Sequence, residues 1–366
     1  MIDRKLIANF NWWFFLVVIT ISVIGIVIIY SANQGRPEPF FRGLYLKQIM
    51  WFFYGLLAML AAVLIDYRTW SRNAYLVYGV ALLALVYTLL FGQVASGARR
   101  WIHLGPVSIQ VSEFAKIALI IVLAKYFEDK RPEGKYQLKD LLIPGFLTAV
   151  FCILIALQPD LGTAMITIFV FFVFIASAEL DSRTMIRIGV AGTISFPALW
   201  FFLRDYQKTR LLTLFNPEMD PLGAGYHSIQ SKIAIGSGGF WGKGLFGGTQ
   251  SRLNFLPEKH TDFIFSVFAE EMGFIGVIIL LLLYLVVILK GLNIAFRSPD
   301  RFGLFLALGI VGTMSFYIVV NIGMTIGILP ITGLPLPLLS YGGSSLITNF
   351  FAIGLLLNIE MRRSIL

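Results

Sequence analysis

Residues 11–31 read NWWFFLVVITISVIGIVIIYS, an apolar run without a charged residue. A helix needs roughly 20 mostly apolar residues to cross the hydrocarbon core of a bilayer, and this run has that length. Similar runs recur along the 366-residue chain. We predict about ten transmembrane helices with the approximate limits 11–31, 45–65, 73–92, 109–127, 140–158, 162–180, 184–203, 262–290, 303–328 and 337–360.

The overall composition supports this interpretation. Hydrophobic residues make up 58% of the chain and charged residues 13%, whereas a soluble domain carries about 25% charged residues. We therefore expect an all-α polytopic membrane protein that forms one membrane-embedded domain over residues 1–366. The single cysteine, Cys152, excludes an internal disulfide. The N-terminal segment lacks a small-residue cleavage site, so we interpret it as a retained first helix.

The basic residues predict the orientation. An even number of spans puts both termini on one side, and cytoplasmic loops are enriched in Lys and Arg. With a cytoplasmic N-terminus, the inner segments hold Arg4, Lys5, Arg68, Arg72, Lys125, Lys130, Arg131, Lys135, Lys139, Arg183, Arg187, Lys290, Arg297, Arg301, Arg362 and Arg363. The short outer loops hold only Arg36, Arg42, Lys47, Arg99 and Arg100. This bias predicts cytoplasmic N- and C-termini, and it explains the net charge of +9 without nucleic-acid binding.

One outer segment, residues 204–261, is long, polar and rich in glycine. A loop of this length in a compact protein is usually functional or disordered. It contains too many hydrophobic residues for disorder. We expect it to be partly structured and to pack against the outer face of the membrane.

Charged residues within spans are costly and tend to be functional. Glu113 and Lys116 in QVSEFAK (110–116) are three residues apart and share a helix face. They form either a pair that fixes helix packing or a charged wall of a substrate cavity. Just before them, Arg99 and Arg100 precede Trp101 at the outer interface. Trp101 is either an interfacial anchor or part of a site, and the arginines suit a lipid phosphate.

Two further segments place polar residues at the outer face. QPDLGT (158–163) is a tight turn in which Asp160 either caps the next helix or serves the site. Asp262 begins the eighth span. One interpretation is that Thr261 or Asp262 caps that helix. The other is that Asp262 acts as a general base at the mouth of a cavity. Asp262, Ser266, Ala269 and Gly273 share a small, polar helix face of the kind that lines a cavity. Glu270 and Glu271 lie deeper and need partners or water.

The segment GLPLPLLSYGGSS (333–345) interrupts the last span with prolines and glycines. Irregular backbone at membrane depth is tolerated where it lines a cavity, and small residues also permit close helix contacts. The three histidines show no metal-ligand spacing, and Gly236, Gly238 and Gly239 follow no strand that would form a nucleotide loop.

Several long motifs then identify a resemblance. They are SEFAK (112–116), QPDLGT (158–163), IQSKIAIGSGGFWGKGLFGGTQ (229–250), LPEKHTDFIF (256–265) and PLPLLSYGGSS (335–345). In this order they closely resemble the shape, elongation, division and sporulation (SEDS) family over nearly the whole chain. The glycine-rich loop and the short termini are similar to the elongation-type, rod-shape-determining members rather than to the division-type paralogue.

The resemblance implies a bacterial cytoplasmic-membrane peptidoglycan glycosyltransferase that polymerises lipid II into β-1,4 glycan strands at the outer face. Asp262 matches the essential aspartate of the family, Glu113 and Lys116 match its supporting charged pair, and Trp101 falls in a family motif. The same motifs contribute His260, Thr261 and Ser340 as supporting residues. A class B penicillin-binding protein, a monofunctional transpeptidase, is the implied partner.

The implied reaction is an inverting displacement of polyprenyl pyrophosphate, with Asp262 as the base. The leaving group needs positive charge, for which the candidates are Arg99, Arg100, Lys116, Arg210 and Lys232. A divalent cation such as Mg²⁺ or Mn²⁺ could share that work, although no carboxylate cluster demands one and no metal ligands are predicted. Three other roles stay open: a flippase for lipid II, a scaffold for partner enzymes, and the division-type role.

Overall fold

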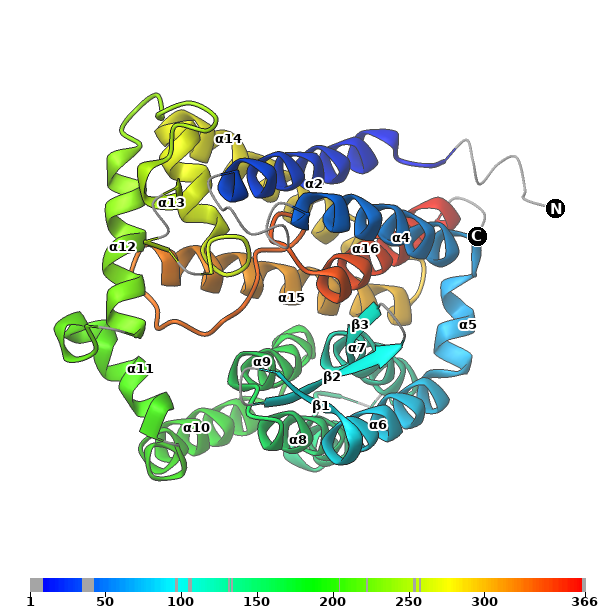
Figure 1. The fold of residues 1–366 in the computed structure, drawn as a ribbon. Helices are drawn as coiled ribbons and strands as arrows, with labels where there is room; N and C mark the ends of the chain where they lie inside the picture. Colours follow the sequence, from blue (N-terminus) through cyan, green and yellow to red (C-terminus); the bar gives the residue numbers. More distant parts are fainter. Residues whose placement is uncertain are drawn as a thin grey trace.

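Long apolar helices dominate the computed structural model (Figure 1). The structure describes residues 9–34, 43–95, 98–104, 107–130, 132, 134–203, 205–221, 223–252, 255–256 and 258–363. Within these residues, seven helical segments are long and apolar enough to cross a membrane. They are α2 (Trp12–Asn33), α4 (Leu44–Leu64), α6 (Ala74–Phe91), η1 with α8 (Leu138–Leu141 and Leu142–Leu157), α14 (Ile264–Phe296), α15 (Arg301–Thr325) and α16 (Gly343–Arg362). The predicted polytopic helical architecture is therefore confirmed.

Three other predicted spans also form helices: one is shorter, one carries several charged residues and one contains a proline. α9 (Leu161–Ser177) is apolar and has 17 residues. α7 (Val111–Asp129) carries the charged residues Glu113, Lys116, Lys125, Glu128 and Asp129. α10 (Ser182–Phe202) contains Pro197. A short helix, α5 (Tyr67–Arg72), joins α4 to α6.

The central helix of the bundle is α15, which packs against α14, α7 and α9 (Figure 1). On one side α16 lies along α4, and α2 packs against both α4 and α14. On the other side α6, α7, α8 and α9 form a second group. α15 and α16 are the most buried of the apolar helices, so the polar side chains they carry face protein rather than lipid.

A small antiparallel sheet, absent from the all-α prediction, lies between α6 and α7. Its strands are β1 (Gln93–Ala95), β2 (Ala98–Leu104) and β3 (Val107–Gln110). Trp101 in β2 lies opposite Gln93 on one side and Gln110 on the other. The span predicted from residue 109 therefore begins at Val111, because residues 107–110 pair as a strand.

The long segment 204–261 is partly helical, as its hydrophobic content predicts. It contains α11 (Asp205–Phe215), η2 (Pro217–Met219), α12 (Ala224–Ser237) and α13 (Thr249–Arg252). α12 packs along α14 (Figure 1). The segment thus returns the chain directly to the start of α14.

The interrupted segment 333–345 packs closely against α2. A β-carbon on Gly25 would lie 2.5 Å from the carbonyl oxygen of Leu339, closer than non-bonded atoms approach. A glycine at this position lets the irregular backbone lie against the helix. The close contact through small residues is therefore present, here between a loop and a helix.

The start of α2 and the end of α16 lie together, since Asn11 donates to the carboxylate of Glu360 at 3.1 Å. At this end of the bundle, the fully buried Asn358 of α16 donates to the carbonyl oxygens of Ala62, Val63 and Ile65 at 2.7–2.9 Å. The side-chain amide of Asn358 therefore hydrogen-bonds the backbone carbonyl groups at the C-terminal end of α4.

Replacing Asn358 by the similarly sized leucine is expected to destabilise the protein, because it leaves these buried carbonyl groups without a donor. The expected cost is on the order of 2 kcal/mol. The apparent melting temperature of the purified variant in detergent measures it. An unchanged melting temperature would show that water replaces the lost donor.

Candidate functional site

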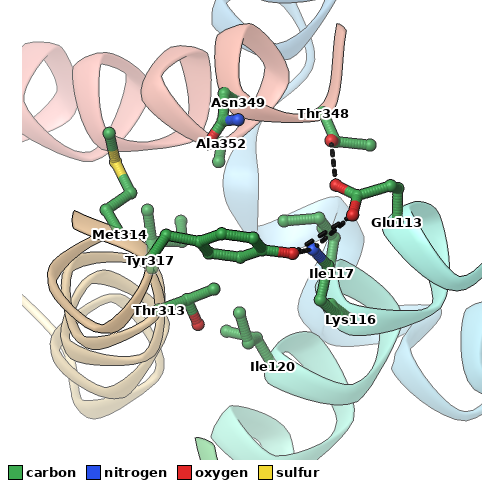
Figure 2. Close-up of a pocket in the computed structure, with 11 residues that line it drawn as sticks. Glu113, Lys116, Ile117, Ile120, Thr313, Met314, Tyr317, Thr348, Asn349 and Ala352 are labelled. Atoms are coloured by element: carbon green, nitrogen blue, oxygen red, sulfur yellow. Dashed lines mark hydrogen bonds and ion pairs between the residues drawn. The ribbon is translucent and has the colours of Figure 1, made fainter. Parts of the chain in front are cut away.

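A buried polar centre joins α7, α15 and α16 (Figure 2). Lys116 donates to Glu113 at 2.9 Å, and each side chain is about 5% exposed. The hydroxyl of Tyr317 donates to the same carboxylate at 3.1 Å and also contacts the Lys116 ammonium group. Thr348 of α16 donates to the second carboxylate oxygen at 3.3 Å. Figure 2 shows the Tyr317 and Thr348 side chains converging on the ion pair from two different helices.

The space beside this centre is small. The cavity lined by Glu113, Lys116 and Tyr317 has a volume of about 20 Å³, which is room for about one water molecule. A sugar does not fit there. The surroundings of the pair therefore support a role in fixing three helices, which is one of its two predicted roles.

Asp262 lies two residues before the first residue of α14, outside that helix. It does not cap the helix: Phe263 holds the N-cap position, and no side chain there accepts a capping hydrogen bond. Within the described part of the chain, no donor is hydrogen-bonded to the Asp262 carboxylate. The residue is half-buried.

The surroundings of Asp262 favour its protonated form. Burial raises the pKa of Asp262 to about 7, the negative charge of Glu258 adds to this, and the positive charge of Arg210 opposes it. A general base works best when its pKa lies near the operating pH. A carboxyl group whose pKa is raised in this way suits proton transfer near neutrality.

Arg210, whose charge acts on Asp262, lines a cavity of about 460 Å³. Its lining includes Arg210 and Thr209 of α11, His227 of α12, Asp220 before α12, and Ile331. Arg210 donates to the carbonyl oxygen of Ile331 at 3.3 Å, and its charge reaches Asp262. Burial lowers the pKa of His227, so this imidazole is neutral at pH 7. The cavity is large and polar enough for a sugar.

The helix face shared by Asp262, Ser266, Ala269 and Gly273 does not line this cavity, so that prediction is wrong. Ser266 is fully buried and hydrogen-bonds Ser231 of α12 at 2.6 Å. The deeper small residues meet the backbone of the loop after α12: Gly238 lies against Ala269, and Gly242 against Gly273. Small side chains on this face serve close packing rather than solvent access.

The two adjacent glutamates of α14 have partners, as their depth requires. Glu270 is fully buried and accepts from Lys243 at 2.7 Å, from the backbone and side chain of Thr249 at 2.7 and 3.0 Å, and from the backbone of Gln250 at 3.0 Å. Glu271 accepts from Ser31 of α2 at 2.5 Å. Together they tie the glycine-rich loop and α2 to α14.

A third polar group surrounds the turn at residue 160. The Asp160 carboxylate accepts from the backbone of Thr163 at 3.3 Å, which is the predicted N-cap, and from Gln110 at 3.1 Å. Arg100 donates to the carbonyl oxygens of Gln158 and Pro159. Its guanidinium thus holds the turn. The Arg99 side chain lies outside the described residues.

Of the other predicted site residues, some lie with Asp262 and some lie elsewhere. His260, Thr261 and Ser340 lie with Asp262, since Tyr341 donates to the carbonyl oxygen of His260 and Ser340 to that of Thr261. Trp101 lies in the sheet, and Lys232 is exposed beside Gly327 at the end of α15. Among the described residues, no group of three or more His, Cys, Asp or Glu could hold a metal ion.

Patterns of ionisable residues do not identify three neutral polar residues, because these lie in apolar spans and carry no charge. Tyr317 and Thr348 belong to the polar centre, and Asn321 of α15 donates to the backbone carbonyl oxygen of Asp262. The signal available was hydrogen-bonding capacity within a span, since such groups need internal partners in lipid.

Comparison with known proteins shows the family of this chain. The sequence model of the FtsW, RodA and SpoVE proteins, described as cell cycle protein, matches residues 10–365. Peptidoglycan glycosyltransferase MrdB of Escherichia coli K12 is 42% identical over 355 residues, which cover 96% of this chain and 93% of that protein. Peptidoglycan glycosyltransferase RodA of Treponema pallidum is 36% identical, and the match covers 98% of this chain and 99% of that protein.

Solved structures show the same fold. A chain from a peptidoglycan synthase complex that coordinates polymerisation and crosslinking aligns with a TM-score of 0.82 at 34% identity, over 97% of this chain and 98% of that chain. The rod shape determining protein RodA of Thermus thermophilus aligns with a TM-score of 0.72 at 31% identity, over 97% of each chain. From the family motifs, the fold and these matches, the chain belongs to the FtsW, RodA and SpoVE family, the SEDS family.

Proposed function

We propose that the protein is a peptidoglycan glycosyltransferase that polymerises lipid II at the outer face of the bacterial cytoplasmic membrane during cell elongation. Relatives with this activity in their names cover nearly the whole chain. The observation that carries the proposal is the half-buried carboxylate of Asp262, which accepts no hydrogen bond within the described residues and is influenced by the charge of Arg210, a residue that lines a cavity of about 460 Å³.

In the proposed reaction, a sugar hydroxyl of one lipid-linked disaccharide attacks the anomeric carbon of another. Asp262 takes the hydroxyl proton as the new carbon–oxygen bond forms. The bond to polyprenyl pyrophosphate breaks, and the leaving group departs with the electron pair, so the α donor bond becomes a β-1,4 bond. Arg210 is our candidate cation for the pyrophosphate charge, since it lines the cavity and its charge acts on Asp262.

The proposed topology has ten spans: the seven apolar helices together with α7, α9 and α10. Both termini are then cytoplasmic by the positive-inside rule, in keeping with the contact between Asn11 and Glu360. Asp262, segment 204–261 and the sheet lie outside. The expected partner is a class B penicillin-binding protein, which supplies the transpeptidase activity that crosslinks the strands; a related chain is part of a peptidoglycan synthase complex.

The direct test is polymerisation of fluorescent lipid II by the purified chain, alone and with its class B partner. We expect glycan polymer that is digested by a muramidase and that forms when the partner's transpeptidase is blocked by a β-lactam. A parallel reaction with chelator tests whether a divalent cation takes part. Translocation of lipid II in liposomes without any polymer would instead support the flippase.

A further inference from the structure

Three successive backbone carbonyl groups, those of residues 260–262, are held by one stretch of chain, residues 321–341. The backbone N–H of Tyr341 donates to the first at 2.9 Å. Ser340 donates to the second at 2.7 Å, and the side-chain amide of Asn321 donates to the third at 2.9 Å. The backbone around Asp262 is thus fixed at each of the residues 260–262.

Asn321 differs from the other two donors because it holds two segments at once. It is fully buried in α15, and the same nitrogen donates to the carbonyl oxygen of Leu334 at 2.7 Å. Leu334 follows Gly333, whose φ is 75° and whose β-carbon, if it had one, would lie 3.5 Å from the Asp262 carboxylate. One amide therefore joins the backbone of Asp262 to the loop that borders its carboxylate.

The rest of this side chain makes no comparable contribution to stability. The Asn321 side-chain oxygen is buried and accepts no hydrogen bond from any described residue. Such a group costs about 1–3 kcal/mol. What asparagine contributes here is therefore the pair of hydrogen bonds to the backbones of residues 262 and 334.

We propose that Asn321 is a positioning residue of the transferase: by joining these two backbones it fixes the Asp262 carboxylate beside the loop at Gly333, in reach of the attacking hydroxyl. This inference rests on the proposed function. The Asn321 amide donates to backbone carbonyl groups and touches no reacting atom. Its loss should therefore lower the rate of the chemical step and leave substrate affinity nearly unchanged.

The test compares Asn321→Leu with Asn358→Leu. Both asparagines are fully buried and donate to backbone carbonyl groups, so each variant removes such donors, at different places in the fold. Asn358→Leu in addition removes an acceptor for the Tyr67 backbone and for Arg362, so it is the more disruptive change for folding. We expect Asn321→Leu to lower kcat by about 10–100-fold, since a misplacement of 1 Å can cost 100-fold, with KM within about threefold of the wild type. Asn358→Leu should keep kcat per folded molecule within about twofold.

A second variant covers the case in which Asn321→Leu does not fold. The hydroxyl of Asn321→Ser can donate to only one of the two carbonyl groups, so kcat should fall by less than in the leucine variant but by more than in Asn358→Leu. Equal kcat losses at positions 321 and 358, or a loss confined to KM, would overturn the positioning role. Failure of the proposed function is distinct, because the wild-type protein would then make no polymer.

Discussion

Replacing Asp262 by Asn is expected to lower the rate of glycan polymerisation by about 10²–10⁴-fold, the range for loss of a general base. An amide has the shape of the carboxylate but cannot take the hydroxyl proton. Folding should be unaffected, because within the described residues the carboxylate accepts no hydrogen bond that the amide would lose. The rate of lipid II consumption by purified protein, normalised to monodisperse protein in detergent, measures the effect.

The pH dependence of the same reaction should carry the signature of this aspartate. Burial, together with the charge of Glu258 and against that of Arg210, raises the pKa of Asp262 to about 7. A base acts only when ionised, so the wild-type rate should fall about tenfold per pH unit below 7 and level off above it. The residual rate of Asp262→Asn should lack this acid limb.

Glu258→Gln is the matched control, four residues earlier in the same segment. It removes a negative charge that raises the pKa of Asp262, so the acid limb should move to lower pH while the rate at pH 8 stays near that of the wild type. If Asp262→Asn kept a rate within tenfold of the wild type and retained the limb, another group would have to be the base.

Much of the architecture could be predicted from local sequence, because span length and apolar content act over a single helix. The same holds for Asp160, whose capping role depends on three following residues, and for the spacing of Glu113 and Lys116. The three-stranded sheet could not be predicted this way, since short strands in a polar outer segment are specified by their pairing and not by their own pattern.

The contacts of the site depend on segments far apart in the chain, and local patterns do not encode them. Tyr317 and Thr348 reach Glu113 from helices that begin some 190 and 230 residues later in the sequence. Likewise, the small residues on one face of α14 could equally line a cavity or allow close packing. The position of α12 determines which of the two occurs.

Removing the Lys116 charge is expected to have the largest effect on stability. In Lys116→Met, the Glu113 carboxylate stays buried, and its remaining donors among the described residues are the Tyr317 and Thr348 hydroxyls. Loss of one partner of a buried ion pair costs about 3–5 kcal/mol. The apparent melting temperature in detergent should fall by many degrees, and polymerisation should fall with it, since α7, α15 and α16 are joined at this centre.

The same helix offers the control. Lys125 pairs with Glu128 at 3.2 Å, also three residues apart, but these side chains are 22% and 26% exposed. It also pairs with Asp129 at 2.8 Å. Exposed pairs contribute about 0–1 kcal/mol, so Lys125→Met should barely shift the melting temperature. Equal losses for the two methionine variants would show that burial does not set the importance of the pair.

The double variant Glu113→Gln with Lys116→Met separates the cost of an unpaired charge from the value of the pair. A neutral amide can still hydrogen-bond Tyr317 and Thr348, while the uncompensated charge is gone. Because replacing both members of a buried ion pair is often neutral or even stabilising, the double variant should melt well above Lys116→Met. If it also polymerises lipid II, the pair serves to hold three helices together; if it folds but makes no polymer, the charges themselves act in the reaction.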